Sequence, residues 1–239
     1  MLSIFVSGFA RQTGKTIVTS GLAATMQSLS FSTSVYKPIQ TDATLLNGIK
    51  RSLDIAFIRR IDPNVNAQST YNLLNIESPF VSSYEENIKI DINTIISDLK
   101  EIAKDSDCSI VEGSNSIFSP IAKNLTELDI IKTLGYEVLL VINPKKTSID
   151  TVISGIKYIQ SQDVSIRGVV LNQYNEDSLN LEEKYFPQIL KEFTNIGILG
   201  SFPEFNNVEK MSPETLISKT INNIDIEEIF GLKIAKLQK

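Results

Sequence analysis

The fold of this chain is decided near its N-terminus, where residues 2–26 read LSIFVSGFARQTGKTIVTSGLAATM. The apolar run 2–6 predicts a buried strand, and the run from Ile17 onward predicts a helix. Between them, a loop bounded by Gly8 and Gly14 can wrap backbone N–H groups around a phosphate chain, and the helix N-terminus favours the negative charge. The stretch therefore predicts a strand, loop and helix that bind a phosphate group.

The side chains of this loop suit a nucleotide and its metal ion. Lys15 can reach the outer phosphates, and the hydroxyl of Thr16 can ligate Mg²⁺. The common spacing G-x-x-x-x-G-K-[ST] is exceeded by one, because five residues separate Gly8 from Gly14. The longer loop is known among nucleotide-dependent ligases and synthetases. A plain glycine turn before a helix is the simplest alternative, but the order of strand, loop, lysine and helix favours phosphate binding.

Composition and charge exclude several classes of protein. Apolar residues make up 42% of the 239 and charged residues 21%, which is ordinary for a folded globular chain. The net charge of −5 comes without a concentrated basic patch, so we expect no nucleic-acid partner. No apolar run reaches the length of about 18 residues that a membrane span needs, and no secretory leader pattern is present. We expect a soluble, cytoplasmic protein with no membrane partner.

Two residue types that often carry chemistry are scarce. Cys108 is the one cysteine and lies in an apolar run, which predicts a buried core residue and excludes a disulfide framework or thiolate metal site within one chain. Histidine is absent. Any proton transfer must therefore use carboxylates, lysine, the substrate or water.

Apolar patterns along the rest of the chain alternate between strands and helices. They predict strands at 32–36, 108–111, 137–142, 165–171 and 196–199, and helices at 51–60, 92–104, 125–134, 148–160 and 181–193, with one or two short helices after Ser212. The polar segment 62–91 lacks periodicity and predicts a long functional loop or a flap over the site. We predict one domain over 1–239, a doubly wound α/β fold of the P-loop NTPase type: a mostly parallel sheet with helices on both faces.

Candidate site residues gather where the predicted strands end. Lys37 follows the second strand, and Pro38 is expected to stop the pairing of that strand and expose the loop. Glu112 ends a buried strand, where proteins with such loops place the acid that holds Mg²⁺, and Asn172 ends another. Taken alone, Asp54 is most simply a first-turn aspartate beside a helix dipole. Because ligands bind at the carboxyl edge of parallel sheets, we expect the strand-end residues to share one site with the phosphate loop.

This constellation resembles the dethiobiotin synthetase family over almost the whole chain. The matching motifs are Gly8-x5-Gly14-Lys15-Thr16, Lys37-Pro38, Asp54, Ser78-Pro79, Val111-Glu112-Gly113, the Val-Val-Leu-Asn run at 169–172 and Phe202-Pro203. The resemblance implies an ATP- and Mg²⁺-dependent cyclo-ligase of biotin biosynthesis that forms dethiobiotin from 7,8-diaminopelargonate and CO2, through a carbamate and a carbamoyl phosphate. It also implies a homodimer, because the family builds its substrate site across two subunits.

The resemblance assigns roles to individual residues. It implies that Lys15 and Lys37 are catalytic, neutralising the transferring phosphoryl group and the carbamate. The implied Mg²⁺ ligands are Thr16, Asp54 and Glu112. The implied substrate contacts are Lys37, Thr41, Glu112 and Gly113. The implied ATP contacts are Gly8, Arg11, Gln12, Thr13, Gly14, Lys15, Thr16, Asn172, which would bond the adenine, Phe202 and Pro203. Phosphoryl transfer of this kind needs alignment and charge neutralisation, so a chain without histidine loses nothing.

The sequence also departs from the family pattern. Arg11 stands where threonine is common, and Gln12 where an acidic residue is common. Ser114, Asn115 and Ser116 replace the usual Ala-Gly-Gly. Asp150 replaces an asparagine in the region that receives the substrate carboxylate across the dimer, where a second carboxylate would repel the first. These changes predict intact nucleotide binding and weaker binding of diaminopelargonate.

Two other functions stay open on the sequence. The amide-forming synthetases of cobalamin synthesis share the P-loop, but they carry a further glutaminase domain with a catalytic cysteine, for which this chain leaves little room. A nucleotide-switch partitioning or regulatory ATPase usually has an extra lysine early in the loop, where Phe9 and Ala10 stand here. Turnover that depends on a protein or membrane partner would favour this last class.

Overall fold

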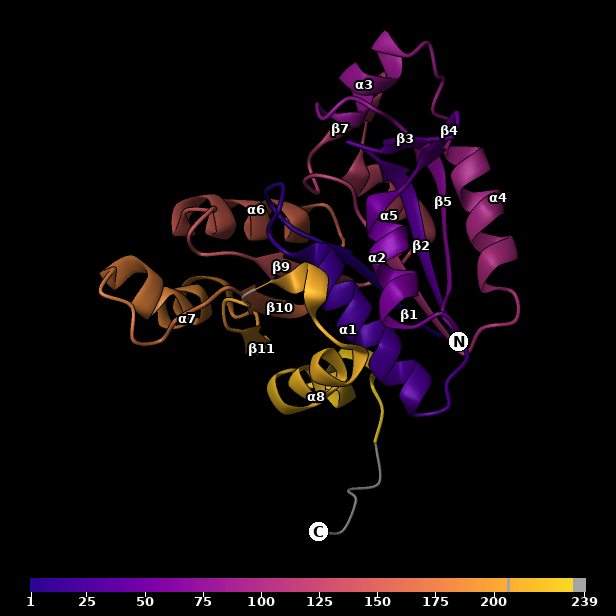
Figure 1. Ribbon diagram of the computed structural model, residues 1–239. Helices are drawn as coiled ribbons and strands as arrows, with labels where there is room; N and C mark the ends of the chain where they lie inside the picture. Colours follow the sequence, from indigo (N-terminus) through magenta and orange to yellow (C-terminus); the bar gives the residue numbers. More distant parts are fainter. Residues whose placement is uncertain (206, 234–239) are drawn as a thin grey trace.

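The computed structural model describes residues 1–205 and 207–233, and this part of the chain folds around a seven-stranded sheet in which every pairing is parallel (Figure 1). From one edge to the other the strands are β11 (Ile198–Phe202), β10 (Ile166–Asn172), β9 (Val138–Ile142), β1 (Leu2–Ser7), β6 (Cys108–Glu112), β2 (Thr33–Gln40) and β5 (Asn66–Asn72). The central strands β9 and β6 are buried along their whole length, as their continuous apolar sequences predict for a sheet covered on both faces.

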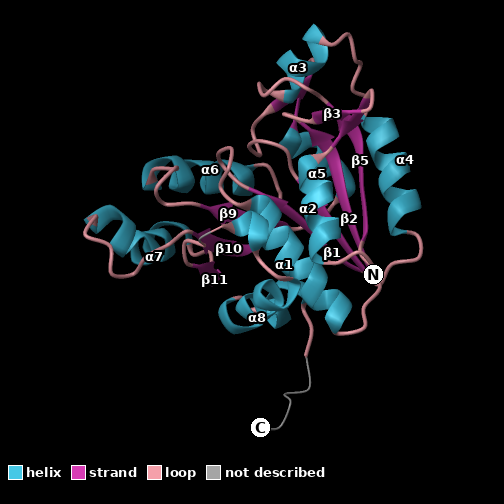
Figure 2. Cartoon of the chain, in the orientation of Figure 1, coloured by secondary structure: helices cyan, strands magenta, loops and turns pink. Residues whose placement is uncertain are grey.

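Helices cover both faces of the sheet (Figure 2). One face carries α4 (Ile92–Ala103), α5 (Glu127–Leu134), α6 (Ile149–Ser161) and α7 (Leu181–Thr194). The other carries α1 (Lys15–Ser28), α2 (Leu53–Ile61), α8 (Pro213–Asn223) and α9 (Ile226–Phe230). The buried apolar residues accordingly form two clusters, one on each face of the sheet. The predicted doubly wound α/β fold is confirmed.

Strand order brings the predicted site residues to one edge. β1 lies in the middle of the sheet between β6 and β9, and its register aligns Val6 with Glu112. The phosphate loop, which follows β1, therefore starts beside the carboxyl end of β6. On the other side, β9 pairs with β10, which ends in Asn172. The predicted meeting of strand ends and phosphate loop is confirmed.

The second strand extends further than predicted. β2 continues through Pro38 to Gln40, and all of its residues are buried. Its pairing with β6 ends at Tyr36, before the proline, whereas its pairing with β5 continues to Gln40. The expectation that Pro38 stops the strand is therefore wrong, because a strand tolerates proline where the missing N–H has no partner to bond. Lys37 consequently lies inside the strand and is 2% exposed.

The polar segment 62–91 is more regular than predicted. It contains β5 at the edge of the sheet and α3 (Pro79–Glu85), so the expectation of an irregular loop is wrong. In β5 only Ala67 is fully buried, because an edge strand pairs on one side and needs few apolar residues. Two short hairpins were also not predicted: β3 (Thr44–Leu46) with β4 (Ile49–Arg51), and β7 (Pro120–Ala122) with β8 (Leu125–Thr126).

Most other elements lie within a few residues of their predicted positions. The last strand is displaced most, since it was predicted at 196–199 and lies at Ile198–Phe202; a 3₁₀ turn (Val208–Lys210) precedes α8. Cys108 is buried, as predicted, and burial raises the pKa of its thiol to about 12. Among the described residues, no helix combines the length and apolar character that crossing a bilayer would need.

Candidate active site

The phosphate loop is packed tightly between the ends of β9 and β10. A Cβ on Gly8 would lie 2.5 Å from the carbonyl oxygen of Val141. Gly14 has a φ of +94°, and a Cβ there would lie 1.9 Å from Nδ2 of Asn172. That amide nitrogen donates to the carbonyl of Thr13 at 2.8 Å. Glycine is therefore required at both ends of the loop, for space at the first and for space and backbone conformation at the second.

Lys15 begins α1 and is held by two neutral groups. Its Nζ donates to the carbonyl oxygens of Asn115 at 2.7 Å and Ala10 at 3.1 Å. Burial lowers the pKa of Lys15 to about 8, although nearby carboxylates, Glu127 foremost, act in the opposite direction. No carboxylate forms an ion pair with Lys15 among the described residues. A bound anion such as a phosphate would provide the negatively charged partner for the Lys15 ammonium.

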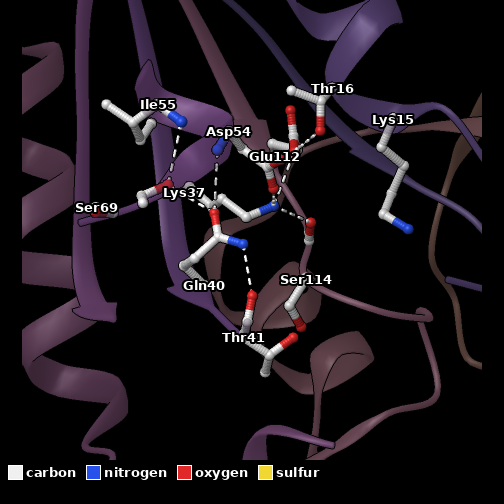
Figure 3. Close-up of polar contacts among 12 residues, drawn as sticks. Lys15, Thr16, Lys37, Gln40, Thr41, Asp54, Ile55, Ser69, Glu112 and Ser114 are labelled. Atoms are coloured by element: carbon white, nitrogen blue, oxygen red, sulfur yellow. Dashed lines mark hydrogen bonds and ion pairs between the residues drawn. The ribbon is translucent and has the colours of Figure 1, made fainter. Parts of the chain in front are cut away.

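Lys37 is the centre of a buried charged cluster (Figure 3). Its Nζ contacts Oδ2 of Asp54 at 2.7 Å, Oε1 of Glu112 at 2.8 Å and the carbonyl of Gly113 at 3.1 Å. Burial disfavours the ammonium, but the two carboxylates outweigh burial and raise the pKa of Lys37 above its ordinary value. The three donors of this ammonium are all used, so its position is fixed from three directions.

The two carboxylates of the cluster differ in electrostatics. Burial opposes ionisation of Asp54, but the Lys37 ammonium outweighs it and holds the pKa of Asp54 below its ordinary value. Glu112 is fully buried, and burial raises its pKa despite the same lysine. The ionised form is therefore favoured at Asp54 and opposed by burial at Glu112, although both carboxylates share the Lys37 ammonium.

The arrangement around Glu112 fits a magnesium ion. Oε1 of Glu112 accepts the hydroxyl of Thr16 at 2.9 Å, whereas its buried Oε2 has no hydrogen-bond partner among the described residues. Asp54 is the second carboxylate at this point. Mg²⁺ prefers oxygen ligands and keeps several from water or phosphate. No group of three or more Cys, His, Asp or Glu suited to a metal occurs in the described ranges, so the protein would supply only part of the coordination.

Asp54 is positioned by residues that the sequence reasoning missed. Ser52 caps α2, since its hydroxyl oxygen accepts the N–H of Ile55 at 3.1 Å. The same hydroxyl donates to Oε1 of Gln40 at 2.6 Å, and Nε2 of Gln40 donates to the carbonyl of Thr41 at 2.6 Å. The end of β2 is thus tied to the start of α2, which places Asp54 beside Lys37. A serine before an apolar helical run is a helix-start signal that could have indicated this cap.

A cavity of about 290 Å³ connects the predicted reactive groups. Its lining includes both predicted catalytic lysines, the three predicted metal ligands and Thr41. Arg11, Gln12 and Gly14 line it as well. Gly113 adjoins it through its contact with Lys37. The hydroxyl of Thr41 donates to Oδ1 of Asn115 at 3.1 Å, so two residues of the lining are bonded to each other.

Other predicted nucleotide residues lie outside that lining. Gly8 and Thr13 contribute backbone to the loop, as described above. Asn172 is buried, and its Oδ1 has no hydrogen-bond partner among the described residues. It is paired in register with Phe202 at the end of β11, whose side chain is packed in the core, and the following Pro203 is exposed.

Two departures from the family pattern meet at one segment. A guanidinium nitrogen of Arg11 donates to the carbonyl of Ile76, and Nδ2 of Asn115 donates to the carbonyl of Glu77 at 3.1 Å. The segment 73–78 follows β5 and is therefore tied both to the phosphate loop and to the segment after β6. The larger side chains at these positions thus hold a neighbouring segment in place beside the cavity.

Asp150 lies apart from the charged cluster. It is exposed in the first turn of α6, and the Ser148 hydroxyl, followed by backbone N–H groups, holds the pKa of its carboxyl below its ordinary value. It lines a second cavity of about 690 Å³ between α5 and α6, together with Phe118 and Tyr158. The carboxylate is therefore charged at neutral pH, as the predicted repulsion of a carboxylate substrate requires.

Comparison with known proteins places the chain in a family. Residues 3–212 match the family described as AAA domain. The chain belongs to this family. Its similarity to individual curated proteins extends over nearly the full length of both partners.

Three relatives illustrate that similarity, and each is named ATP-dependent dethiobiotin synthetase BioD. That of Nitrosopumilus maritimus is 26% identical over 235 residues, covering 96% of this chain and 99% of that protein. That of Clostridium acetobutylicum is 27% identical, covering 97% and 98%. That of Bacillus subtilis is 26% identical, covering 93% and 96%. The predicted resemblance to the dethiobiotin synthetases is confirmed.

Solved structures support the fold of this AAA-domain chain. The MinC:MinD cell division protein complex of Aquifex aeolicus has a chain with a TM-score of 0.61 and 15% identity, covering 100% of this chain and 99% of that one. The septum site-determining protein MinD of Pyrococcus horikoshii, complexed with Mg-ADP, has a TM-score of 0.56 and 16% identity, covering 97% and 90%. At such identities these likenesses concern the fold alone.

Proposed function

We propose that this chain is an ATP- and Mg²⁺-dependent cyclo-ligase that forms dethiobiotin from 7,8-diaminopelargonate and CO2. The observation that carries the proposal is the buried cluster of Lys37, Asp54 and Glu112 beside a phosphate loop, in a chain similar over nearly its whole length to dethiobiotin synthetases. Lys15, together with a magnesium ion held at the carboxylates of this cluster, would neutralise and align a phosphoryl group without a protein nucleophile.

The proposed reaction uses the substrate's own amines as nucleophiles. One amine attacks CO2 and loses a proton to give a carbamate, whose oxygen attacks the γ-phosphorus of ATP and displaces ADP. The second amine then attacks the carbamoyl carbon and gives up a proton to the departing phosphate, which leaves as the ring closes. Lys15, now bonded to two carbonyls, turns to the phosphates, while Lys37 holds charge beside the carbamate.

The nucleotide and metal contacts follow from the same geometry. Thr16, Asp54 and Glu112 would hold Mg²⁺, which neutralises phosphate charge when bound. Oδ1 of Asn172, which is buried and has no partner in the part of the chain that the structure describes, would accept a hydrogen bond from the adenine amino group. Thr41 and Gly113 lie where the diamine would meet Lys37.

We also propose that the enzyme is a cytoplasmic homodimer. Within one chain, Asp150 lines a different cavity from the reactive groups. The support for the dimer is the resemblance to the dethiobiotin synthetases, which implies a substrate site built across two subunits. Light scattering of the purified protein tests the dimer, and a monomer at assay concentration contradicts it.

The reaction is tested by measuring ADP release with Mg²⁺-ATP and bicarbonate, with and without 7,8-diaminopelargonate, and identifying the product by mass. Diamine-dependent ADP and dethiobiotin support the proposal, and Lys15→Met serves as the inactive control. Nucleotide binding without either product overturns it. Turnover that instead requires a protein or membrane partner would favour a switch ATPase, for which the MinD likeness gives support at the level of fold only.

A further inference from the structure

A buried glutamate outside the predicted site joins two of its segments. Glu127, the first residue of α5, is 2% exposed. Its Oε1 accepts the hydroxyl of Ser7 at 2.5 Å. Its Oε2 accepts both the backbone N–H and the hydroxyl of Ser114, at 2.7 and 3.2 Å. Ser7 and Ser114 donate all of these bonds, so both oxygens of Glu127 act as acceptors.

The two serines that donate to Glu127 lie at the ends of the strands that lead into the candidate site. Ser7 ends β1 immediately before the phosphate loop, and Ser114 follows the end of β6. The carboxylate is pressed against Gly113, where a Cβ would lie 2.2 Å from Oε1 of Glu127. A glycine is therefore needed at 113 for this approach. Glu127 thus links β1 and β6 at the edge where the candidate site lies.

One peptide group connects Glu127 to Lys37. The Gly113–Ser114 peptide donates its N–H to Glu127 at 2.7 Å and accepts Nζ of Lys37 on its carbonyl oxygen at 3.1 Å. An anion therefore lies at the donor end of this peptide dipole and a cation at the acceptor end. Charged partners at both ends strengthen the two hydrogen bonds and fix the orientation of the peptide.

We propose that Glu127 is a positioning residue that fixes the Lys37 ammonium through the Gly113–Ser114 peptide. Two residues after Gly113, the carbonyl oxygen of Asn115 accepts a hydrogen bond from Nζ of Lys15 at 2.7 Å. Holding this segment therefore sets the places of both lysines. The consequence for turnover rests on the function proposed above, whereas the placement of Lys37 does not.

The placement is tested by NMR of two variants and a matched control. Glu127→Gln keeps the size and can still accept the Ser114 N–H, but it removes the anion; Glu127→Asp keeps the anion but shortens the reach. Glu183→Gln is the control, because Glu183 is also buried in the first turn of a helix and accepts a serine hydroxyl, that of Ser178 at 2.7 Å, and a backbone N–H.

We expect the amide resonance of Ser114 and the ammonium resonance of Lys37 to shift together in both Glu127 variants and to stay in place in the control. A Lys37 resonance that is unchanged while that of Ser114 moves overturns the proposal. Retention of the wild-type thermal unfolding midpoint in Glu127→Gln establishes that the shift does not arise from unfolding. These readouts need no substrate, so they stand even if no dethiobiotin is formed.

Steady-state kinetics then test the consequence for turnover. If wild-type protein forms dethiobiotin, Glu127→Gln is expected to lower kcat on the order of tenfold while the KM for ATP changes by less than about twofold, because the placement of Lys37 matters in the transition state rather than for nucleotide binding. A wild-type kcat in folded Glu127→Gln overturns the positioning role. If the wild-type protein forms no dethiobiotin, that result contradicts the proposed function and not the positioning role of Glu127.

Discussion

ATP binding is expected to take up protons in a pH-dependent amount set by Lys15. Burial lowers the pKa of this lysine to about 8, and its Nζ contacts only two carbonyl oxygens among the described residues. At pH 8 about half of the free protein then carries a neutral Lys15, compared with about one tenth at pH 7. The phosphates of ATP favour the ammonium and raise its pKa in the complex. Binding should therefore take up about 0.5 proton at pH 8 and about 0.1 at pH 7.

The sign of the linked affinity change follows from the same shift. Because the pKa of Lys15 is higher in the complex than in the free protein, ATP affinity is full below about pH 8 and falls above it, by at most about tenfold per pH unit. Isothermal titration calorimetry in buffers with different ionisation enthalpies measures the proton uptake directly. Equal uptake at pH 7 and pH 8, or uptake that persists in Lys15→Met, would refute the reasoning.

Three further substitutions have distinct expected outcomes. Lys37→Met leaves two carboxylates without their shared ammonium and should lower the free energy of unfolding by about 3–5 kcal/mol in urea titrations; unchanged stability contradicts the cluster. Asn172→Ala removes a buried acceptor and should raise the KM for ATP on the order of tenfold at nearly constant kcat, so a fall in kcat alone argues against an adenine contact. Arg11→Thr removes a charged donor and should speed amide hydrogen exchange in 73–78 by about 10-fold or more; wild-type protection there would show that the contact holds nothing.

The strand ends could be predicted because their signals are local. An apolar run that stops at Glu112 or Asn172 marks both a buried strand and its carboxyl end, and parallel topology brings such ends together. The phosphate loop carries its own glycines and lysine in the order that its chemistry needs. Asp54 differs, because the residues alone indicated only a helix-dipole role and the family resemblance implied a Mg²⁺ ligand; its ion pair with Lys37 was not predicted.

The errors have physical causes that a single sequence does not display. β5 is polar because an edge strand pairs on one side only, so its composition resembles a loop. The burial of Lys37 depends on β2 continuing past a proline, and that continuation is stabilised by pairing with β5. Because β5 was not predicted, the burial of Lys37 was not predicted either.

Glu127 shows a second limit of local reasoning. In the sequence it is an ordinary acid in the first turn of an amphipathic helix, a common position that needs no further explanation. Its partner Ser7 lies 120 residues away, and the bond between them exists only because β1 and β6 are neighbours in the sheet. Residues whose role is to hold other residues carry no motif of their own.

Several residues that depart from the family pattern contact the same neighbouring segments of the structure. Arg11 and Asn115 were each unusual in isolation, yet they donate to the carbonyls of the adjacent residues Ile76 and Glu77. Ser114 likewise supplies a hydroxyl to Glu127 that a smaller residue could not. Arg11, Asn115 and Ser114 each add a contact beside the cavity, and the glycines at the two ends of the phosphate loop are kept. These replacements therefore change how the segments around the cavity are held, while Gly8, Gly14 and Lys15 keep the phosphate loop in the form that its sequence predicts.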